Sequence, residues 1–238
     1  ALAITGLLAL PELSNVEQIE VLKGPASILY GEIQPGGAVN FITEVPTDEP
    51  QAEGGLELGS RGFYRHYVDV SEWLNAEGSA RFRLNGSFQS EDSFRGFNQG
   101  TQRTFVAPVM AFDLSDRTHL ILDLEYLSDQ RASDSGLVAI GNRVADLPRD
   151  RIAGEPRDRL ERDFLSTGYR LEHEINDSWT FRNAFRVSAQ SYEANAFTPL
   201  QFDETTGQVS RLNAATQWYQ DYYGLQTDIT GTFDTGNL

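Results

Sequence analysis

The sequence predicts a mainly β protein, in the form of a partial antiparallel up-and-down β-barrel that crosses a membrane. Three observations predict this fold class: a series of strand-like runs, connections of two alternating lengths, and arginines on the polar faces of the strands. A soluble β-sandwich would usually lack the second feature, and its packed core would penalise unpaired charges. The modest apolar content fits a barrel, since a transmembrane strand needs only about 10 residues of alternating hydrophobicity.

Strand-like runs follow one another from residue 53 onward, and several have the two-residue period of a strand with one apolar face. Leu120, Leu122 and Leu124, for example, share one face opposite Asp123, and we expect their face to point outward. The run at 103–114 is ambiguous, because both of its faces carry apolar residues. The eight runs span approximately residues 53–60, 64–74, 80–91, 103–114, 118–128, 164–176, 179–194 and 209–233.

The polar faces of these runs carry charge. Phe181 and Phe185 alternate with Arg182 and Arg186, and Arg83 has a similar place in an earlier run. Arginines in the middle of strands suit a wide, wet interior, where water and carboxylates can surround the guanidinium group. We therefore expect these arginines to face the space that the sheet encloses.

The connections differ at the two ends of the predicted sheet. Short turns rich in Asn, Asp, Ser and Gly lie at residues 75–79, 115–118 and 176–178. Longer polar connections lie near residues 91–102, 129–163 and 196–209. Short turns at one end and long loops at the other are typical of an outer-membrane barrel.

Composition excludes several classes of function. The 238 residues carry a net charge of −16, which argues against nucleic acid or an anionic membrane surface as the main partner. The chain has no cysteine, so disulfide frameworks, cysteine-ligated metals and thiol chemistry are excluded. The longest mostly apolar stretch, residues 2–10, is well short of the roughly 20 residues of a transmembrane helix.

The first fifty residues have a different pattern. Residues 16–22 alternate as a strand, Gly24-Pro25 interrupts them, and residues 26–30 can form a short helical turn. After a Gln-Pro-Gly-Gly turn, residues 38–43 read as another short strand. This is a compact α+β element, and the two prolines and two acids of residues 45–50 indicate a linker.

Two segments of this element, VEQIEVLKGPASILYG at 16–31 and PGGAVNFIT at 35–43, closely resemble the end of the plug domain in TonB-dependent outer-membrane receptors. Further pieces resemble ferric-siderophore receptors and occur in the family's order, at residues 83–86, 108–118, 147–156 and 171–185. The resemblance implies the C-terminal half of an α+β plug at residues 1–44, a linker at 45–50, and the first strands of the barrel at 51–238. It also implies a barrel of roughly 22 strands, of which this chain would supply about eight.

The resemblance implies a receptor of the Gram-negative cell outer membrane that takes up ferric siderophores and is not an enzyme. Its expected partners are the ferric siderophore, outer-membrane lipid, and a TonB-type energy-coupling protein bound by a segment upstream of Ala1, where the first half of the plug is also expected. No cofactor and no protein metal site are expected, since His66, His119 and His173 have no ligand spacing and iron would arrive inside its chelator. Another cargo (cobalamin, heme or an oligosaccharide) and, with less support, a soluble β-sheet binding domain stay open as alternatives.

The resemblance also suggests ligand-binding residues. Tyr30 and Gln34 lie in the region that corresponds to the upper loops of the plug, and the phenol of Tyr30 could stack on a chelate or hydrogen-bond to it. On the barrel, the aromatic candidates are Tyr192 and Phe197 at the end of the seventh run, with Phe94 and Phe97 in a long loop behind them. An aromatic belt at the lipid interface, or packing of the plug for Tyr30, is the simpler role for such residues.

Overall fold

The computed structural model describes residues 12–24, 37–97 and 100–233, and its regular structure there consists of strands. The helical turn expected at residues 26–30 lies outside the described residues. Within them, no helix is long and apolar enough to cross a membrane. The strands are β1 (Val16–Lys23), β2 (Gly37–Thr43), β3 (Gln51–Leu58), β4 (Tyr64–Trp73), β5 (Ala80–Glu91), β6 (Thr101–Ser115), β7 (Thr118–Ala132), β8 (Ala139–Ile140), β9 (Arg143–Val144), β10 (Arg159–Asn176), β11 (Trp179–Asp203) and β12 (Gln208–Gly231).

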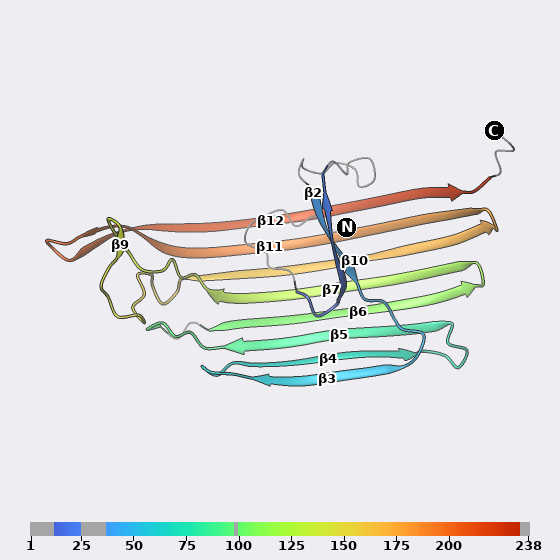
Figure 1. Cartoon of the computed structure of the whole chain (residues 1–238), viewed down its shortest axis with the longest axis horizontal. Helices are drawn as coiled ribbons and strands as arrows, with labels where there is room; N and C mark the ends of the chain where they lie inside the picture. Colours follow the sequence, from blue (N-terminus) through green and yellow to red (C-terminus); the bar gives the residue numbers. More distant parts are fainter. Residues whose placement is uncertain (1–11, 25–36, 98–99, 234–238) are drawn as a thin grey trace.

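Eight of these strands form one sheet in the order β12-β11-β10-β7-β6-β5-β4-β3 (Figure 1). Each strand pairs antiparallel with its neighbours along the chain, and the short β8–β9 hairpin lies within the connection between β7 and β10. The eight predicted runs are thereby confirmed as an up-and-down antiparallel sheet. Pairing between sequence neighbours leaves every interior strand hydrogen-bonded on both sides, which a sheet in lipid requires.

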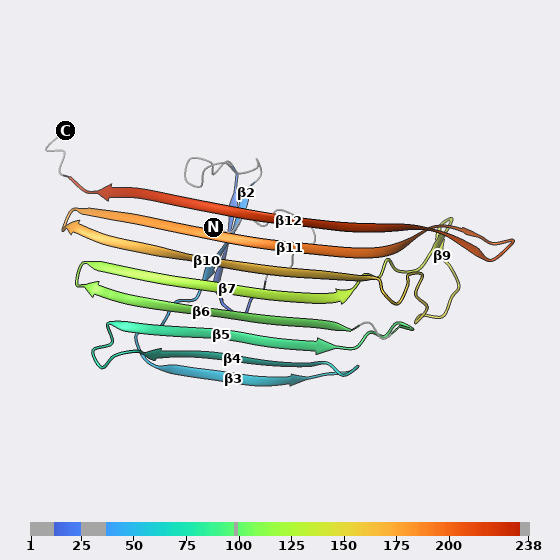
Figure 2. The same ribbon diagram turned by 180° about the vertical axis from the view of Figure 1, so that it is seen from behind.

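The two ends of the sheet differ as predicted (Figure 2). At one end, two residues join β6 to β7 and two join β10 to β11, at 116–117 and 177–178. At the other end, residues 92–100 join β5 to β6, and residues 133–158 join β7 to β10.

The long loop expected at residues 196–209 is wrong. Strands β11 and β12 stay paired as far as Asp203 and Gln208, and Gly207 adopts a φ of 70° in the tight turn between them. Hydrogen bonds from Thr206 and from the backbone amide of Thr205 lower the pKa of the Asp203 carboxyl group at this tip. The two strands have 25 and 24 residues, more than a membrane crossing needs, so they extend beyond the apolar zone. Both faces of a strand can be polar there, which is why the alternation in the sequence stops before the strand does.

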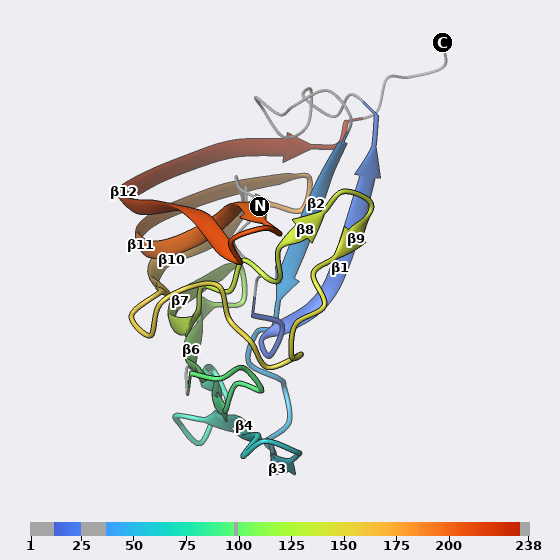
Figure 3. The same cartoon turned by 90° about the vertical axis from the view of Figure 1, so that its left-hand side faces the viewer.

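The sheet curves, and β1 and β2 lie on its concave side (Figure 3). Glu125 of β7 interacts with Asn15, which lies just before β1, so this face of β7 is the concave one. Asp123 lies on the same face, and the Arg186 guanidinium group is 2.6 Å from its carboxylate. Arg186 therefore points to the concave side. The opposite, convex face carries an apolar row in which strand register aligns Met110, Leu122, Tyr169, Phe185 and Leu225. The leucines of β7 and the phenylalanines of β11 are therefore on the convex face, as the alternation predicts.

Strand β6 is apolar on both faces because each face has a different cover. Phe105 and Ala107 are buried on the concave face, where they join Leu127 and Phe164 in the core cluster. Met110 lies on the convex face and is exposed. The ambiguity of this run in the sequence thus reflects one apolar face toward the β1–β2 hairpin and another on the convex side.

The two faces predict opposite responses to charge in adjacent residues of β12. In the full-length protein, Leu225→Arg should destabilise the folded barrel by about 2–4 kcal/mol, because it places a cation on the lipid face. Gln226→Arg is the matched control, since its side chain lies on the concave face and should change stability little. Urea unfolding in lipid bilayers measures both values, and equal destabilisation by the two substitutions would contradict the assignment of the faces.

Candidate functional site

The candidate site is the concave face of the sheet, together with the β1–β2 hairpin, which the resemblance assigns to the plug, and the loops at the long-loop end. Strands β1 and β2 pair with each other from Val16↔Thr43 to Lys23↔Gly37. The hydrogen bonds that join this hairpin to the sheet come from its base, residues 12–15 and 44–48. The backbone amide of Glu44 donates to the carbonyl of Asn15 at 2.9 Å, so the two halves of the base are fixed to each other.

The first half of the base contacts two arginines of the wall. Arg65 donates to Ser14 Oγ at 2.9 Å, and its Nη2 lies 3.8 Å from Glu12 Oε1. Arg103 Nη1 lies 3.5 Å from the other oxygen of Glu12. Ser14 also donates to Ser87 Oγ at 3.5 Å. One carboxylate of the plug side is therefore shared by guanidinium groups from β4 and β6.

Arg83 on β5 is the centre of the contact with the second half of the base. Its side chain makes two parallel hydrogen bonds to Asp69, at 2.8 and 2.7 Å, and a third to the carbonyl of Val45 at 3.1 Å. Its Nη2 also lies 2.9 Å from Glu44, which accepts a hydrogen bond from Asn85 as well. Arg83 is only 8% exposed, so these groups neutralise a nearly buried cation. A paired geometry with every partner in place is what makes such burial tolerable.

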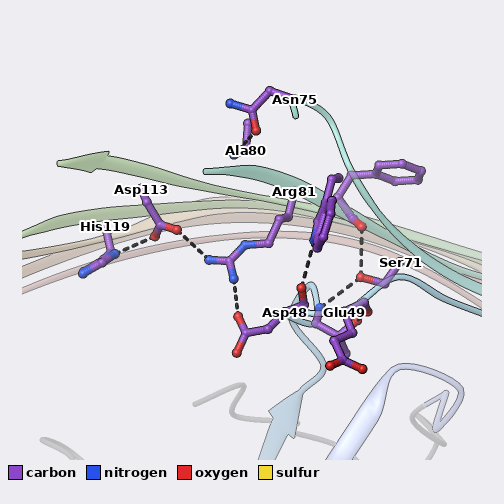
Figure 4. Close-up of polar contacts among 11 residues, drawn as sticks. Asp48, Glu49, Ser71, Asn75, Ala80, Arg81, Asp113 and His119 are labelled. Carbon is purple, nitrogen blue, oxygen red and sulfur yellow. Dashed lines mark hydrogen bonds and ion pairs between the residues drawn. The ribbon is translucent and has the colours of Figure 1, made fainter. Parts of the chain in front are cut away.

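Residues 45–50, expected as a linker, are held to the wall (Figure 4). The amide of Thr47 donates to the hydroxyl of the buried Ser71 at 2.9 Å, and the Trp73 indole donates to the carbonyl of Asp48 at 2.8 Å. Arg81 pairs with the Asp48 carboxylate. A cavity of about 440 Å³ remains between this segment and β5, β6 and β7. The hydrogen bonds of the Thr47 amide and the Asp48 carbonyl use main-chain groups, so they fix the path of the segment independently of its side chains.

The contacts of Arg81 continue along the short-turn end of the wall. Its other terminal nitrogen lies 2.9 Å from Asp113 on β6, and Asp113 Oδ1 lies 2.6 Å from His119 Nδ1 on β7 (Figure 4). The segment after the plug is thus connected through side chains to three successive strands.

Nearer the long-loop end of the concave face, strand register aligns one residue of each strand in the eight-stranded sheet. We call this line of residues the polar row. Arg103 and Arg162 flank Asp129, and Tyr192 stacks on Trp218 with ring centroids 5.4 Å apart. The row runs from β3 to β12 through Glu57, Arg65, Gln89, Arg103, Asp129, Arg162, Tyr192 and Trp218.

At the long-loop end, Arg95 joins the two long loops. Its Nε donates to Asp134 at 2.6 Å, and its Nη1 donates to the carbonyls of Arg149 and Arg151 at 2.9 and 3.1 Å. The ring of Phe94 lies against the guanidinium groups of Arg95 and Arg149, at 4.8 and 5.8 Å, and remains 49% exposed. An exposed aromatic ring with two adjacent cations is suited to contact a ligand that is both aromatic and anionic.

Asp158, which is fully buried, fixes the far end of the loop between β7 and β10. Its carboxylate accepts hydrogen bonds from the amides of Glu155 and Phe197, at 2.8 and 2.9 Å. Arg211 of β12 lies over the Phe197 ring at 4.9 Å and pairs with Glu155 at 2.7 Å. The loop between β7 and β10 is therefore attached to the β11–β12 hairpin.

The structure places the predicted ligand-binding residues in separate positions. Tyr30 and Gln34 lie outside the described residues, and Phe94 and Phe97 lie in the loop between β5 and β6. Tyr192 and Phe197 are within β11, which continues to Asp203, so their expected place at the end of a strand is wrong. Tyr192 faces the concave side, whereas the unbroken register places Phe197 on the opposite face. Ligand contact by any of these residues stays a prediction.

The residues that sequence reasoning missed are arginines of the polar row. Arg103 begins a run whose two apolar faces hid its orientation, and Arg162 falls in the long polar connection expected near residues 129–163. Strand β10 in fact begins at Arg159, so Arg162 is a residue of the wall. Among the described residues, no group of three or more histidines and carboxylates is placed to hold a metal ion.

The contacts of Arg83 predict an asymmetry between two arginine variants. In the full-length protein, Arg83→Ala should destabilise the seated plug by about 3–5 kcal/mol, because it leaves the Asp69 and Glu44 carboxylates without their buried cation. Arg182→Ala is the control, since Arg182 pairs with Glu172 in an exposed position and should cost less than about 1 kcal/mol. Denaturant unfolding of the plug in the purified receptor measures both, and a similar small cost for the two variants would contradict the role of Arg83.

Comparisons with known proteins agree with this arrangement. The family described as TonB-dependent Receptor Plug Domain matches residues 5–38. The metal-pseudopaline receptor CntO of Pseudomonas aeruginosa is 31% identical over 236 residues, which cover 98% of this chain and 33% of the relative. The catecholate siderophore receptor Fiu of Escherichia coli is 26% identical over 247 residues, covering 94% and 32%.

Solved structures give the same fold. The open form of the ferric-catecholate import receptor Fiu from E. coli superimposes with a TM-score of 0.83 at 25% identity, over 94% of this chain and 37% of that one. The pyoverdine outer membrane receptor FpvA from Pseudomonas aeruginosa superimposes with a TM-score of 0.85 at 21% identity, over 95% and 34%, and supports the fold alone. The chain spans about a third of the length of these relatives. Over that third, from the plug hairpin to the last described strand of the wall, it is part of a TonB-dependent receptor of the outer membrane.

Proposed function

We propose that the protein to which this chain belongs is a TonB-dependent importer of ferric siderophores or closely related metal chelates. The observation that carries the proposal is the position of β1 and β2 on the concave side of the sheet, held there by ion pairs of the wall. A passive pore has no use for a polypeptide seated inside it. A seated plug with its own polar contacts is what a regulated importer requires.

The cargo class is proposed from the relatives. Those described above are called receptors for metal-pseudopaline, catecholate siderophores and pyoverdine, all of which are metal chelators. The long-loop end of this chain suits such a cargo, because Phe94 presents an exposed ring between two cations. Cobalamin, heme or an oligosaccharide is the alternative, for which the described residues offer no comparable feature.

The partners and the mechanism follow from the same proposal. Energy would come from a TonB-type protein acting through a segment upstream of this chain, and iron would stay inside its chelator without protein ligands. The protein would carry out no covalent chemistry. Tyr30 and Gln34 on the plug, with Tyr192, Phe197, Phe94 and Phe97 on the wall and its loops, are the proposed contacts for the chelate.

The proposal predicts growth that depends on both cargo and energy. Cells without their own siderophore receptors should grow in iron-limited medium when they produce the full-length protein and receive a ferric tris-catecholate or an iron-loaded carboxylate metallophore. The same cells without TonB should bind the chelate and fail to grow.

Hydroxamate, heme and cobalamin sources in parallel cultures identify the cargo class. Failure of every metal chelate to bind or to support growth, with normal amounts of the protein in the outer membrane, would contradict the proposal. Growth on heme or cobalamin alone would replace it with the alternative.

A further inference from the structure

The polar row has a concentration of guanidinium groups around one carboxylate. Asp129 lies 3.8 Å from Arg103, also pairs with Arg131, and is the cross-strand neighbour of Arg162. Three arginines from β6, β7 and β10 thus meet at a carboxylate that is 2% exposed. The three guanidinium groups outnumber the two wall carboxylates near them, Asp129 and Glu125, so the cluster attracts anions.

A second carboxylate reaches this cluster from the plug side. Glu12 lies 3.5 Å from Arg103 and 3.8 Å from Arg65, the next arginine of the polar row. It is the charged side chain that connects the first half of the plug base to the row, beside the neutral contacts of Ser14. Displacement of residues 12–15 would therefore remove a negative charge from two wall arginines at once.

Burial shows at which stage this cluster could meet a ligand. Arg162 is 6% exposed and Tyr192 is 5% exposed, so a molecule that arrives from outside cannot reach them in this state of the protein. A chelate that passes through the space enclosed by the sheet has to displace the polypeptide that occupies it. Displacement of residues 12–15 would uncover Arg65 and Arg103, and the stacked Tyr192–Trp218 pair lies further along the same row.

We propose that Glu12 occupies, in the seated state, a wall site that binds the anionic groups of a metal chelate during its passage. The inference depends on the proposed import function and concerns a step after the first binding event. Guanidinium groups bind carboxylate and catecholate oxygens through charge-assisted hydrogen bonds, and Tyr192 and Trp218 offer an aromatic surface to a planar ligand. The plug carboxylate thereby prevents the site from retaining anions before transport begins.

The test compares binding with uptake in the full-length receptor, using the radioiron-labelled chelate that supports growth. Arg131→Gln and Arg103→Gln should leave the affinity for that chelate on de-energised cells unchanged and lower the maximal uptake rate about tenfold, as expected for loss of one charge-assisted hydrogen bond. Arg131→Lys should recover most of the uptake, because it keeps the charge. Arg182→Gln is the matched control: it removes a cation from the same face near the short-turn end and should transport normally.

Equal amounts of folded receptor in the outer membrane are checked for every variant by surface labelling. Uptake at the wild-type rate by both glutamine variants would overturn the inference. A parallel fall in affinity and uptake would also overturn it, because the arginines would then belong to the first binding site, and equal impairment by Arg131→Lys would make their role structural. If the wild-type receptor itself neither binds nor imports a chelate, the proposed function fails and this inference fails with it.

Discussion

The hydrogen-bonding needs of a backbone in lipid determine most of this architecture. Unpaired N–H and C=O groups are too costly in the hydrocarbon region, so each strand must pair on both sides along its membrane-crossing length. The up-and-down order meets this need, with connections between neighbours alone, for the six strands that lie between β3 and β12 in the described sheet. An antiparallel sheet also sends alternate side chains to opposite faces, so an apolar face toward lipid entails a second face that is free to be polar.

That second face carries the described contacts between the sheet and the segments on either side of the β1–β2 hairpin. Arg83 and Arg81 fix the segment that follows β2, and Arg65 and Arg103 contact the segment that precedes β1. Among the described residues these contacts are hydrogen bonds and ion pairs, which distinguishes this interface from an apolar core. The apolar cluster around Phe105 gives the middle of the wall a small core on the same side.

Sequence reasoning recovers what local pattern encodes. The two-residue period was sufficient to predict the eight strands, and the turn residues were sufficient to predict that the two ends of the sheet differ. The segments at 16–31 and 35–43 were sufficient to suggest the family. The sequence did not predict how far β11 extends. The part of a hairpin that lies in water needs no apolar face, so its residues show no alternation of apolar and polar side chains. The fixed path of residues 45–50 was missed as well, since it depends on Ser71, Trp73 and Arg81 of distant strands. The polar row depends on the register of every strand at once, and register is set by pairing that no single segment reveals.

The central claim, that residues 12–15 are seated on the concave wall, can be tested by a disulfide. The hydroxyl oxygens of Ser14 and Ser87 are 3.5 Å apart, and residues 1–238 contain no cysteine. Any cysteine elsewhere in the receptor is replaced by serine before the test. In the full-length receptor, Ser14→Cys with Ser87→Cys should form a disulfide on mild oxidation in the outer membrane, whereas Ser14→Cys with Ser191→Cys, on the convex face, should not. Free thiols at both positions of the first pair in a folded receptor would contradict the seating of the plug.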